Sequence, residues 1–217
     1  MIRNLKFLGL ALVAALAMSS VLVSMASADV ITSESGGVTT AKGTGSLGVF
    51  KVHGGEVKCS VVSYSGSFSS GGSTASVTPT YEKCSFAGLS ATIDMNTCSY
   101  KVNINGGSST EGTVDVVCTK AGDEITVTAP SVGTKKCIVH VPAQTGLTSG
   151  TGTNIGSGTT REITLDINIT NIKYSQTAGT AETGNCATAD NTTLGTYTGT
   201  AIVTGSVGGA HVGIFLS

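Results

Sequence analysis

The sequence predicts an all-β fold: an antiparallel β-sandwich, or a barrel-like sheet, of about ten short strands joined by disulfides. Val and Ile alternate with polar residues over short segments, which is typical of strands with one buried face. Glycine-rich turns separate these segments. After residue 28, no stretch keeps the apolar spacing of three and four that an amphipathic helix needs.

In order along the chain, we expect strands near Leu47–Val52, Val57–Tyr64, Ala75–Thr78, Ala91–Met95, Cys98–Ile104, Thr113–Thr119, Glu124–Ala129, Lys136–Val141, Arg161–Thr170, Thr196–Thr204 and Val212–Leu216. The clearest alternation places Ile163, Leu165, Ile167 and Ile169 on one face. Ile172 follows Ile169 out of phase, so we expect a β-bulge near Thr170–Asn171 that restores the inward face.

Three hairpin registers follow from these strands. Placing Cys98 opposite Cys118 pairs Tyr100 with Val116, Val102 with Val114 and Ile104 with Gly112. A second hairpin aligns Ile125 with Val141, Val127 with Val139 and Ala129 with Cys137. A third pairs Ile202 with Ile214 across a turn at Gly205–Ala210. Two Gly/Thr-rich segments stay outside this scheme and are expected to be loops, Pro142–Thr160 and Ser175–Gly195.

The beginning of the chain has the parts of a secretory signal. Arg3 and Lys6 give a positive start, an apolar run follows over Phe7–Val23, and Ala26-Ser27-Ala28 matches the small-residue cleavage pattern. The sequence therefore predicts a signal peptide over 1–28 and a secreted β-sandwich domain over 29–217. We expect the product outside the cell, free or held at the cell surface.

All six cysteines follow this leader, so we expect an oxidising compartment and disulfides. Their order along the chain favours the pairs Cys59–Cys84, Cys98–Cys118 and Cys137–Cys186. Six cysteines allow many other connectivities, and the sequence leaves these open.

Composition limits the partners. Loss of the leader, with Arg3 and Lys6, changes the formal net charge from −1 to −3. This weak, dispersed charge argues against nucleic acid, and no apolar stretch after the leader approaches the ~20 residues of a membrane span. The chain has no Trp, and aromatic residues are 5% of it. We therefore expect a tightly packed core of small β-branched residues rather than a deep ligand pocket.

No residue pattern predicts a catalytic, cofactor-binding or metal site. Gly43–Gly48 matches a dinucleotide-loop pattern but lacks the strand before it and the helix after it. His53, His140 and His211 are scattered and have no metal-type spacing, and His140 should point outward because both its neighbours are apolar.

Carboxylate, amide and tyrosine side chains could also form a catalytic or binding site. A hydrolase of the glycosidase type needs two carboxylates, which could come from Asp94, Asp115, Asp123, Glu124, Glu162 and Asp166. Short oxygen-rich runs begin at Asp94, Asp166 and Asp190, but none has calcium-loop spacing. The five tyrosines are Tyr64, Tyr81, Tyr100, Tyr174 and Tyr197. We expect them to be buried with bonded hydroxyls rather than gathered in an exposed patch.

Several segments are similar to a known group of proteins. They are Val77–Tyr81 with Cys84, Ala91–Asn96 with Cys98–Tyr100, Gly112–Cys118, Val141–Gln144, Thr160–Arg161 and Asn171–Tyr174. In these segments the chain resembles uncharacterised secreted, Cys-containing, β-rich proteins of soil actinobacteria. The resemblance implies secretion and a β-rich fold, and it implies no function.

Two functions are compatible with these features. The first is a non-enzymatic extracellular or cell-surface protein, structural or binding, with an extracellular polymer or protein as partner and with self-association through strand edges. The alternative is an extracellular hydrolase that acts on a polymer through a carboxylate pair.

Overall fold

The structure is a computed structural model that describes residues 30–104, 112–130, 136–177, 186 and 189–217. The predicted signal peptide lies outside these residues. In this part of the chain the all-β prediction is confirmed, and the short 3-10 turn η1 (Gly158–Thr160) is the one helical element described. Among the described residues, no helix has the length and apolar character that a membrane crossing requires.

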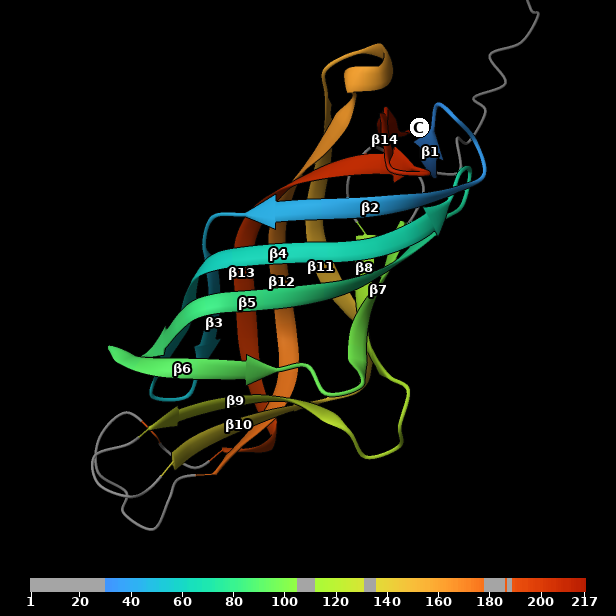
Figure 1. The fold of residues 1–217 in the computed structure, drawn as a ribbon. Helices are drawn as coiled ribbons and strands as arrows, with labels where there is room; N and C mark the ends of the chain where they lie inside the picture. Colours follow the sequence, from blue (N-terminus) through green and yellow to red (C-terminus); the bar gives the residue numbers. More distant parts are fainter. Residues whose placement is uncertain (1–29, 105–111, 131–135, 178–185, 187–188) are drawn as a thin grey trace, which may run out of the picture.

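The strands are more numerous, and several are longer, than the sequence indicates. In chain order they are β1 (Ile31–Ser33), β2 (Val38–Gly45), β3 (Gly48–Val52), β4 (Gly55–Ser69), β5 (Thr74–Phe86), β6 (Leu89–Asp94), β7 (Cys98–Ile104), β8 (Gly112–Cys118), β9 (Glu124–Pro130), β10 (Lys136–Pro142), β11 (Gln144–Ile155), β12 (Glu162–Thr177), β13 (Ala189–Val207), β14 (Ala210–Val212) and β15 (Ile214–Leu216). Figure 1 shows β2, β4 and β5 passing in front of β11, β12 and β13 and running crosswise to them.

Four long strands, β4, β5, β12 and β13, serve both ends of the molecule. Each pairs with one neighbour near one end of the molecule and with a different neighbour near the other end. β4 and β13 both pair with β2 at one end and with β3 at the other. In the same way β12 pairs with β11 and then β10, and β5 with β7 and then β6. The long strands therefore connect two barrel-like ends.

Both ends close on themselves. At one end the order of paired strands is β4-β2-β13-β12-β11-β8-β7-β5, and at the other β4-β3-β13-β12-β10-β9-β6-β5, each returning through the β4–β5 pairing. Closure removes most of the free strand edges that strand addition uses. Self-association through strand edges stays a prediction, and β14 is one strand that pairs on one side only in the described chain.

Two of the predicted hairpin registers are confirmed. Cys98 lies opposite Cys118 and Tyr100 opposite Val116 in β7 and β8. Val127 lies opposite Val139 in β9 and β10. The bulge near Thr170–Asn171 is also confirmed, because the β12 register shifts between Ile169 and Ile172 and Asn171 has a φ of 61°.

The third register is wrong. Gly205 pairs with Val212 and Val207 with Ala210, one residue out of the expected phase, because Gly208 and Gly209 form a two-residue turn with positive φ at both positions. A one-residue shift exchanges the two faces of a strand. Ile202 accordingly lies outside, 44% exposed, while Ile214 is buried and pairs with Ser33 of β1.

The expected loops are largely strands. Pro142–Thr160 contains β11, and Ser175–Gly195 contains the end of β12 and the start of β13; residues 178–185 and 187–188 lie outside the described chain. β2 was not predicted. Its buried face consists of Thr39, Ala41 and Gly43, which are too small to give a strong apolar alternation.

Two clusters of buried residues divide the interior. The smaller one, Ile31, Ala41, Phe68, Ile163 and Ile214, belongs to the end closed by β2, β11, β8 and β7, which we name the cavity half. The larger cluster extends into the end closed by β3, β6, β9 and β10, which we name the disulfide half. The disulfides Cys59–Cys84, Cys98–Cys118 and Cys137–Cys186 join to this larger cluster, and they are the three predicted pairs.

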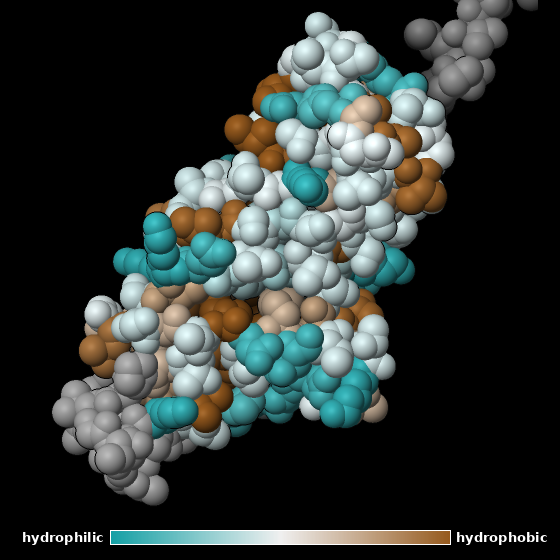
Figure 2. Space-filling view, in the orientation of Figure 1, coloured by the Kyte–Doolittle hydropathy of each residue, from teal (hydrophilic) through white to brown (hydrophobic). Residues whose placement is uncertain are grey.

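The outer surface is weakly polar. Figure 2 shows a face that is mostly pale, with a few strongly hydrophilic residues and scattered hydrophobic ones. Ser and Thr occupy the outward positions of the strands in front, for example Thr44, Ser63 and Thr80, which are paired across β2, β4 and β5. The apolar partners of this alternation point into the barrel.

Candidate functional site

An apolar cavity of about 170 Å³ lies inside the cavity half. Its walls include Val77 of β5, Val102 of β7, Val114 of β8 and the inward row Ile163, Leu165 and Ile167 of β12. The prediction of a tightly packed interior without a deep pocket is therefore wrong. An eight-stranded closed sheet has an interior that side chains can just fill or that can hold one small ligand, and here they do not fill it.

The cavity exists because small residues stand at inward positions. Ala41 and Gly43 of β2 and Ala75 of β5 all line it. None of them extends more than a methyl group toward β12 across the barrel. At Gly43 a methyl group would also lie 3.1 Å from the ring of Tyr64, so the glycine leaves room for that ring. The hollow follows from residue size rather than from loop arrangement.

Four tyrosines gather at the side of the cavity that faces the disulfide half. The hydroxyl oxygens of Tyr64 and Tyr197 are 3.3 Å apart, and those of Tyr81 and Tyr100 are 3.0 Å apart. The rings of Tyr81 and Tyr197 meet edge to face with centroids 6.3 Å apart. We name these four residues the tyrosine cluster. The prediction of packed tyrosines with bonded hydroxyls is confirmed for them.

The tyrosine cluster separates two hollows. Tyr64, Tyr100 and Tyr197 line the large cavity, and Tyr81, Tyr100 and Tyr197 line a second one of about 60 Å³ in the disulfide half. Tyr174, the fifth tyrosine, lines neither; it packs against Phe50 and bonds through its hydroxyl to the backbone N–H of His53. The large cavity thus has apolar walls and a phenolic floor.

Burial sets the protonation of these phenols. It raises the pKa of Tyr81 well above its usual value and that of Tyr100 to about 12. Burial likewise raises the pKa of Tyr64, to which the neighbouring Tyr197 adds. It also raises the pKa of Tyr197, although hydrogen bonds with Tyr64 and Tyr81 act in the opposite direction. Near neutral pH, all four are therefore neutral groups that can donate and accept hydrogen bonds.

The two-stranded sheet of β1 and β15 covers the other end of the cavity. Ile31 and Leu216 both line the hollow and are paired in this sheet. The side chain of Asn154 in β11 holds Leu216 by two hydrogen bonds, accepting from its N–H and donating to its carbonyl, each 2.8 Å long. Other contacts also hold the β1–β15 cover to the barrel. The Ile214 N–H donates to the Arg161 carbonyl, the Ser33 N–H donates to the Ser70 hydroxyl, and the Arg161 guanidinium lies over the Phe215 ring.

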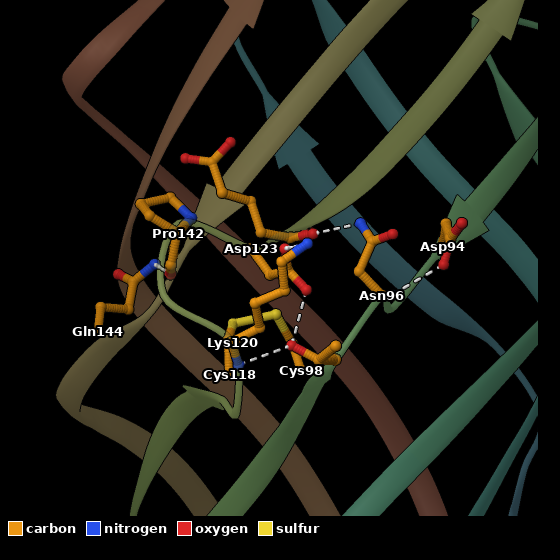
Figure 3. The surroundings of a disulfide bond; sticks show 10 residues. Asp94, Asn96, Cys98, Cys118, Lys120, Asp123, Pro142 and Gln144 are labelled. Atoms are coloured by element: carbon orange, nitrogen blue, oxygen red, sulfur yellow. Dashed lines mark hydrogen bonds and ion pairs between the residues drawn. A yellow bond between two sulfur atoms is a disulfide. The ribbon is translucent and has the colours of Figure 1, made fainter.

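The candidate carboxylates near the Cys98–Cys118 disulfide stabilise turns. Asp94 accepts a hydrogen bond from the Asn96 backbone, and Asp123 accepts one from the Thr97 hydroxyl and lies 3.7 Å from the Lys120 ammonium (Figure 3). Glu124 contacts His140 at 3.2 Å on the outer face. Each of these carboxylates has a structural partner.

The remaining acidic candidates keep their carboxylates outside the cavity, although Asp166 is among the residues that line it. Asp115 accepts from the Gly146 N–H and from Asn103, which lowers its pKa, and Glu162 lies 4.0 Å from His211. Asp166 is exposed, because it alternates with Leu165 and Ile167. A general acid needs a raised pKa, and the shift at Asp115 has the opposite sign.

The other predicted candidates are placed as follows. Asp190 caps its own turn by accepting from the Thr192 N–H and hydroxyl. His211 contacts the Thr159 carbonyl, and His140 points outward between the buried Val139 and Val141, as predicted. The segment Gly43–Gly48 ends β2 and begins β3. Among the described residues, no group of His, Cys, Asp and Glu forms a metal-ligand set.

Comparisons with protein-family models, with curated proteins and with solved structures found no match to this chain.

Proposed function

We propose that the protein is a non-enzymatic, secreted binding protein that holds a small apolar molecule inside the cavity half. The observation that carries this proposal is the apolar cavity of about 170 Å³, lined by strands of the closed sheet and by the β1–β15 cover. Ligand sites are typically concave and apolar, with a few placed polar groups, and the mouths of β-barrels are frequent locations.

The walls and floor support this proposal together. Aliphatic side chains from β12 and from β5, β7 and β8 supply apolar contact, while Tyr64 and Tyr197 supply hydroxyls. An unfilled cavity costs stability, roughly in proportion to its volume. A ligand that fills it would regain those contacts.

The disulfides and the predicted signal peptide support a binding role outside the cell. The three disulfides are consistent with an oxidising compartment, where structural disulfides persist. The predicted signal peptide over 1–28 supports secretion. The acidic candidates for the alternative, a hydrolase, hold turns or lie on the outer face, so a binding protein accounts for more of the chain.

Thermal unfolding in the presence of cyclohexane or benzene tests the proposal. A ligand that binds only the folded state stabilises it by RT ln(1 + [L]/Kd), about 2.7 kcal/mol at one hundred times Kd. In a domain of this size each kcal/mol moves Tm by roughly 2–4 °C. We expect saturating cyclohexane to raise Tm of the wild type by several degrees.

The control is the variant Ala75→Leu, in which three added carbon atoms occupy the cavity. Its Tm should not respond to cyclohexane. If the wild type shows no shift, or if both proteins shift equally, the cavity is not a binding site and the proposed function is wrong.

A further inference from the structure

We propose that the ligand is a neutral molecule with one oxygen acceptor, such as a cyclic ketone, whose oxygen accepts a hydrogen bond from the Tyr64–Tyr197 pair. This inference rests on the proposed function and adds the chemical class of the ligand. It is carried by the placement of two phenols at the floor of an otherwise apolar hollow.

The buried tyrosine hydroxyls have more donor protons than the contacts among them use. Each phenol carries one O–H donor. The 3.3 Å contact between Tyr64 and Tyr197 uses one of their two protons, because one hydroxyl donates and the other accepts. Tyr197 also hydrogen-bonds with Tyr81, which bonds to Tyr100, so three contacts join the four hydroxyls of the tyrosine cluster and use three of their four protons. One O–H donor of the cluster is left over, and the side chains of Tyr64 and Tyr197 both line the cavity. A donor in an apolar cavity is satisfied when a ligand brings an acceptor.

Charge complementarity then selects a neutral ligand. Among the described residues that line the cavity, Asp166 is the one with a charged side chain, and its carboxylate lies on the outer face of β12 because its neighbours Leu165 and Ile167 point inward. An anion or a cation would enter the cavity without a counter-charge, at a high desolvation cost. The raised pKa values of Tyr64 and Tyr197 keep these donors protonated across the physiological range.

Size sets the upper bound. A cavity of about 150 Å³ lined by aliphatic and aromatic side chains binds benzene. The volume here is about 170 Å³. The site therefore takes molecules of roughly six to ten non-hydrogen atoms, which fits a monocyclic ketone and excludes a polymer chain.

The test compares cyclohexanone with methylenecyclohexane, which has nearly the same shape but a CH₂ group in place of the oxygen. Both are titrated by NMR into the wild type and into Tyr64→Phe/Tyr197→Phe. Both hydroxyls are removed because a single change would release the remaining one toward the ligand. We expect Kd for cyclohexanone to rise about five- to tenfold in the double variant, the loss of one hydrogen bond. Kd for methylenecyclohexane should change by less than twofold.

Tyr174→Phe is the matched control, because it removes a buried hydroxyl outside both cavities and should leave both Kd values unchanged. The infrared C=O stretch of cyclohexanone bound to the wild type gives a second readout that needs no variant. It should lie below the frequency measured in cyclohexane solution.

The outcomes separate the two claims. If both probes bind the wild type, but their affinities fall equally in the double variant and the C=O stretch keeps its alkane value, the ligand class is wrong while the binding function stands. If neither probe binds the wild type, the proposed function fails, and this inference fails with it.

Discussion

The two halves of the barrel share their long strands and differ in how their interiors are filled. In the disulfide half, bulky side chains such as Phe50, Phe86 and Tyr174 meet in a large buried cluster, and all three disulfides join it. In the cavity half, the buried cluster has five members, one of them an alanine, and it surrounds a hollow.

This difference separates stability from function within one closed sheet. The disulfide half has the larger buried cluster, the covalent links and only the smaller hollow of about 60 Å³, so it can hold β4, β5, β12 and β13 in place. The same strands then form the walls of the cavity half without having to fill it. The stability that the unfilled cavity half lacks is thereby supplied by the packing and the disulfides of the disulfide half. Substitutions in the two halves should therefore have different effects.

The largest effect is expected from removal of a disulfide. Cys137→Ala/Cys186→Ala should lower the free energy of unfolding by about 4 kcal/mol, because this bridge closes the longest loop, with a sequence separation of 49. Cys98→Ala/Cys118→Ala, with a separation of 20, should cost about 3 kcal/mol. Urea denaturation measures both.

Below the melting temperature, Kd for cyclohexane should stay within twofold of the wild-type value in Cys137→Ala/Cys186→Ala. A large loss of affinity in the folded variant would show that the halves are not independent.

Alanine-to-leucine changes should have opposite signs in the two halves. Ala75→Leu adds carbon atoms to a hollow and should raise the free energy of unfolding by about 1 kcal/mol. Ala129→Leu places the same atoms in the disulfide half, where Ala129 is 2% exposed, and should lower it by about 2 kcal/mol through overpacking. Equal destabilisation by both changes would mean that the cavity half is as densely packed as its counterpart.

Alkaline pH should reveal the tyrosine cluster. Burial raises the pKa of Tyr64, Tyr81, Tyr100 and Tyr197, for Tyr100 to about 12, whereas the unfolded chain ionises near 10. Their contribution to stability is complete below pH 10 and is lost as the pH rises from 10 through about 12. At pH 11 the variant Tyr64→Phe/Tyr197→Phe should recover roughly 2 kcal/mol of this loss, about 1 kcal/mol per hydroxyl.

Tyrosinate absorbance measured together with unfolding checks this prediction. The four phenols should ionise only as the protein unfolds. Free ionisation of all five tyrosines near pH 10 in the folded protein would contradict their burial.

The smallest effect on stability concerns the β1–β15 cover. Asn154→Ala removes the two hydrogen bonds to Leu216 and should lower global stability by about 1 kcal/mol or less. It should nevertheless speed amide hydrogen exchange at Leu216 and increase the ligand association and dissociation rates. Asn168→Ala, on the outer face of β12, is the control. Unchanged rates in Asn154→Ala would mean that the ligand enters elsewhere.

The fold was more accessible from the sequence than the site. Val and Ile alternation predicts the β12 row and its bulge, and cysteine order predicts the disulfides, because these signals are local. The β13–β14 register depends on which two glycines form the turn, and a choice that is wrong by one residue exposes Ile202 instead of burying it. β11 and β2 were missed because Gly and Thr dominate them.

The cavity could not be predicted because it arises from residues that are distant in sequence. Nothing in the sequence marks Ala41 and Ala75 as cavity residues. They line the cavity because the fold brings β2 and β5 around the same hollow as Leu165 of β12. The tyrosine cluster likewise needs β4, β5, β7 and β13 in their places. Scarcity of aromatic residues indicates small side chains correctly, but small side chains can leave a hollow as well as pack tightly.

Methyl NMR during a cyclohexane titration tests the central claim most directly. The account predicts saturable shifts of the Ile163, Leu165 and Ile167 methyl signals, whereas those of Ala91, Ala129 and Val139 in the disulfide half stay in place. Shifts spread equally over both sets, or no saturable shift in either, would contradict the existence of a ligand cavity confined to one half.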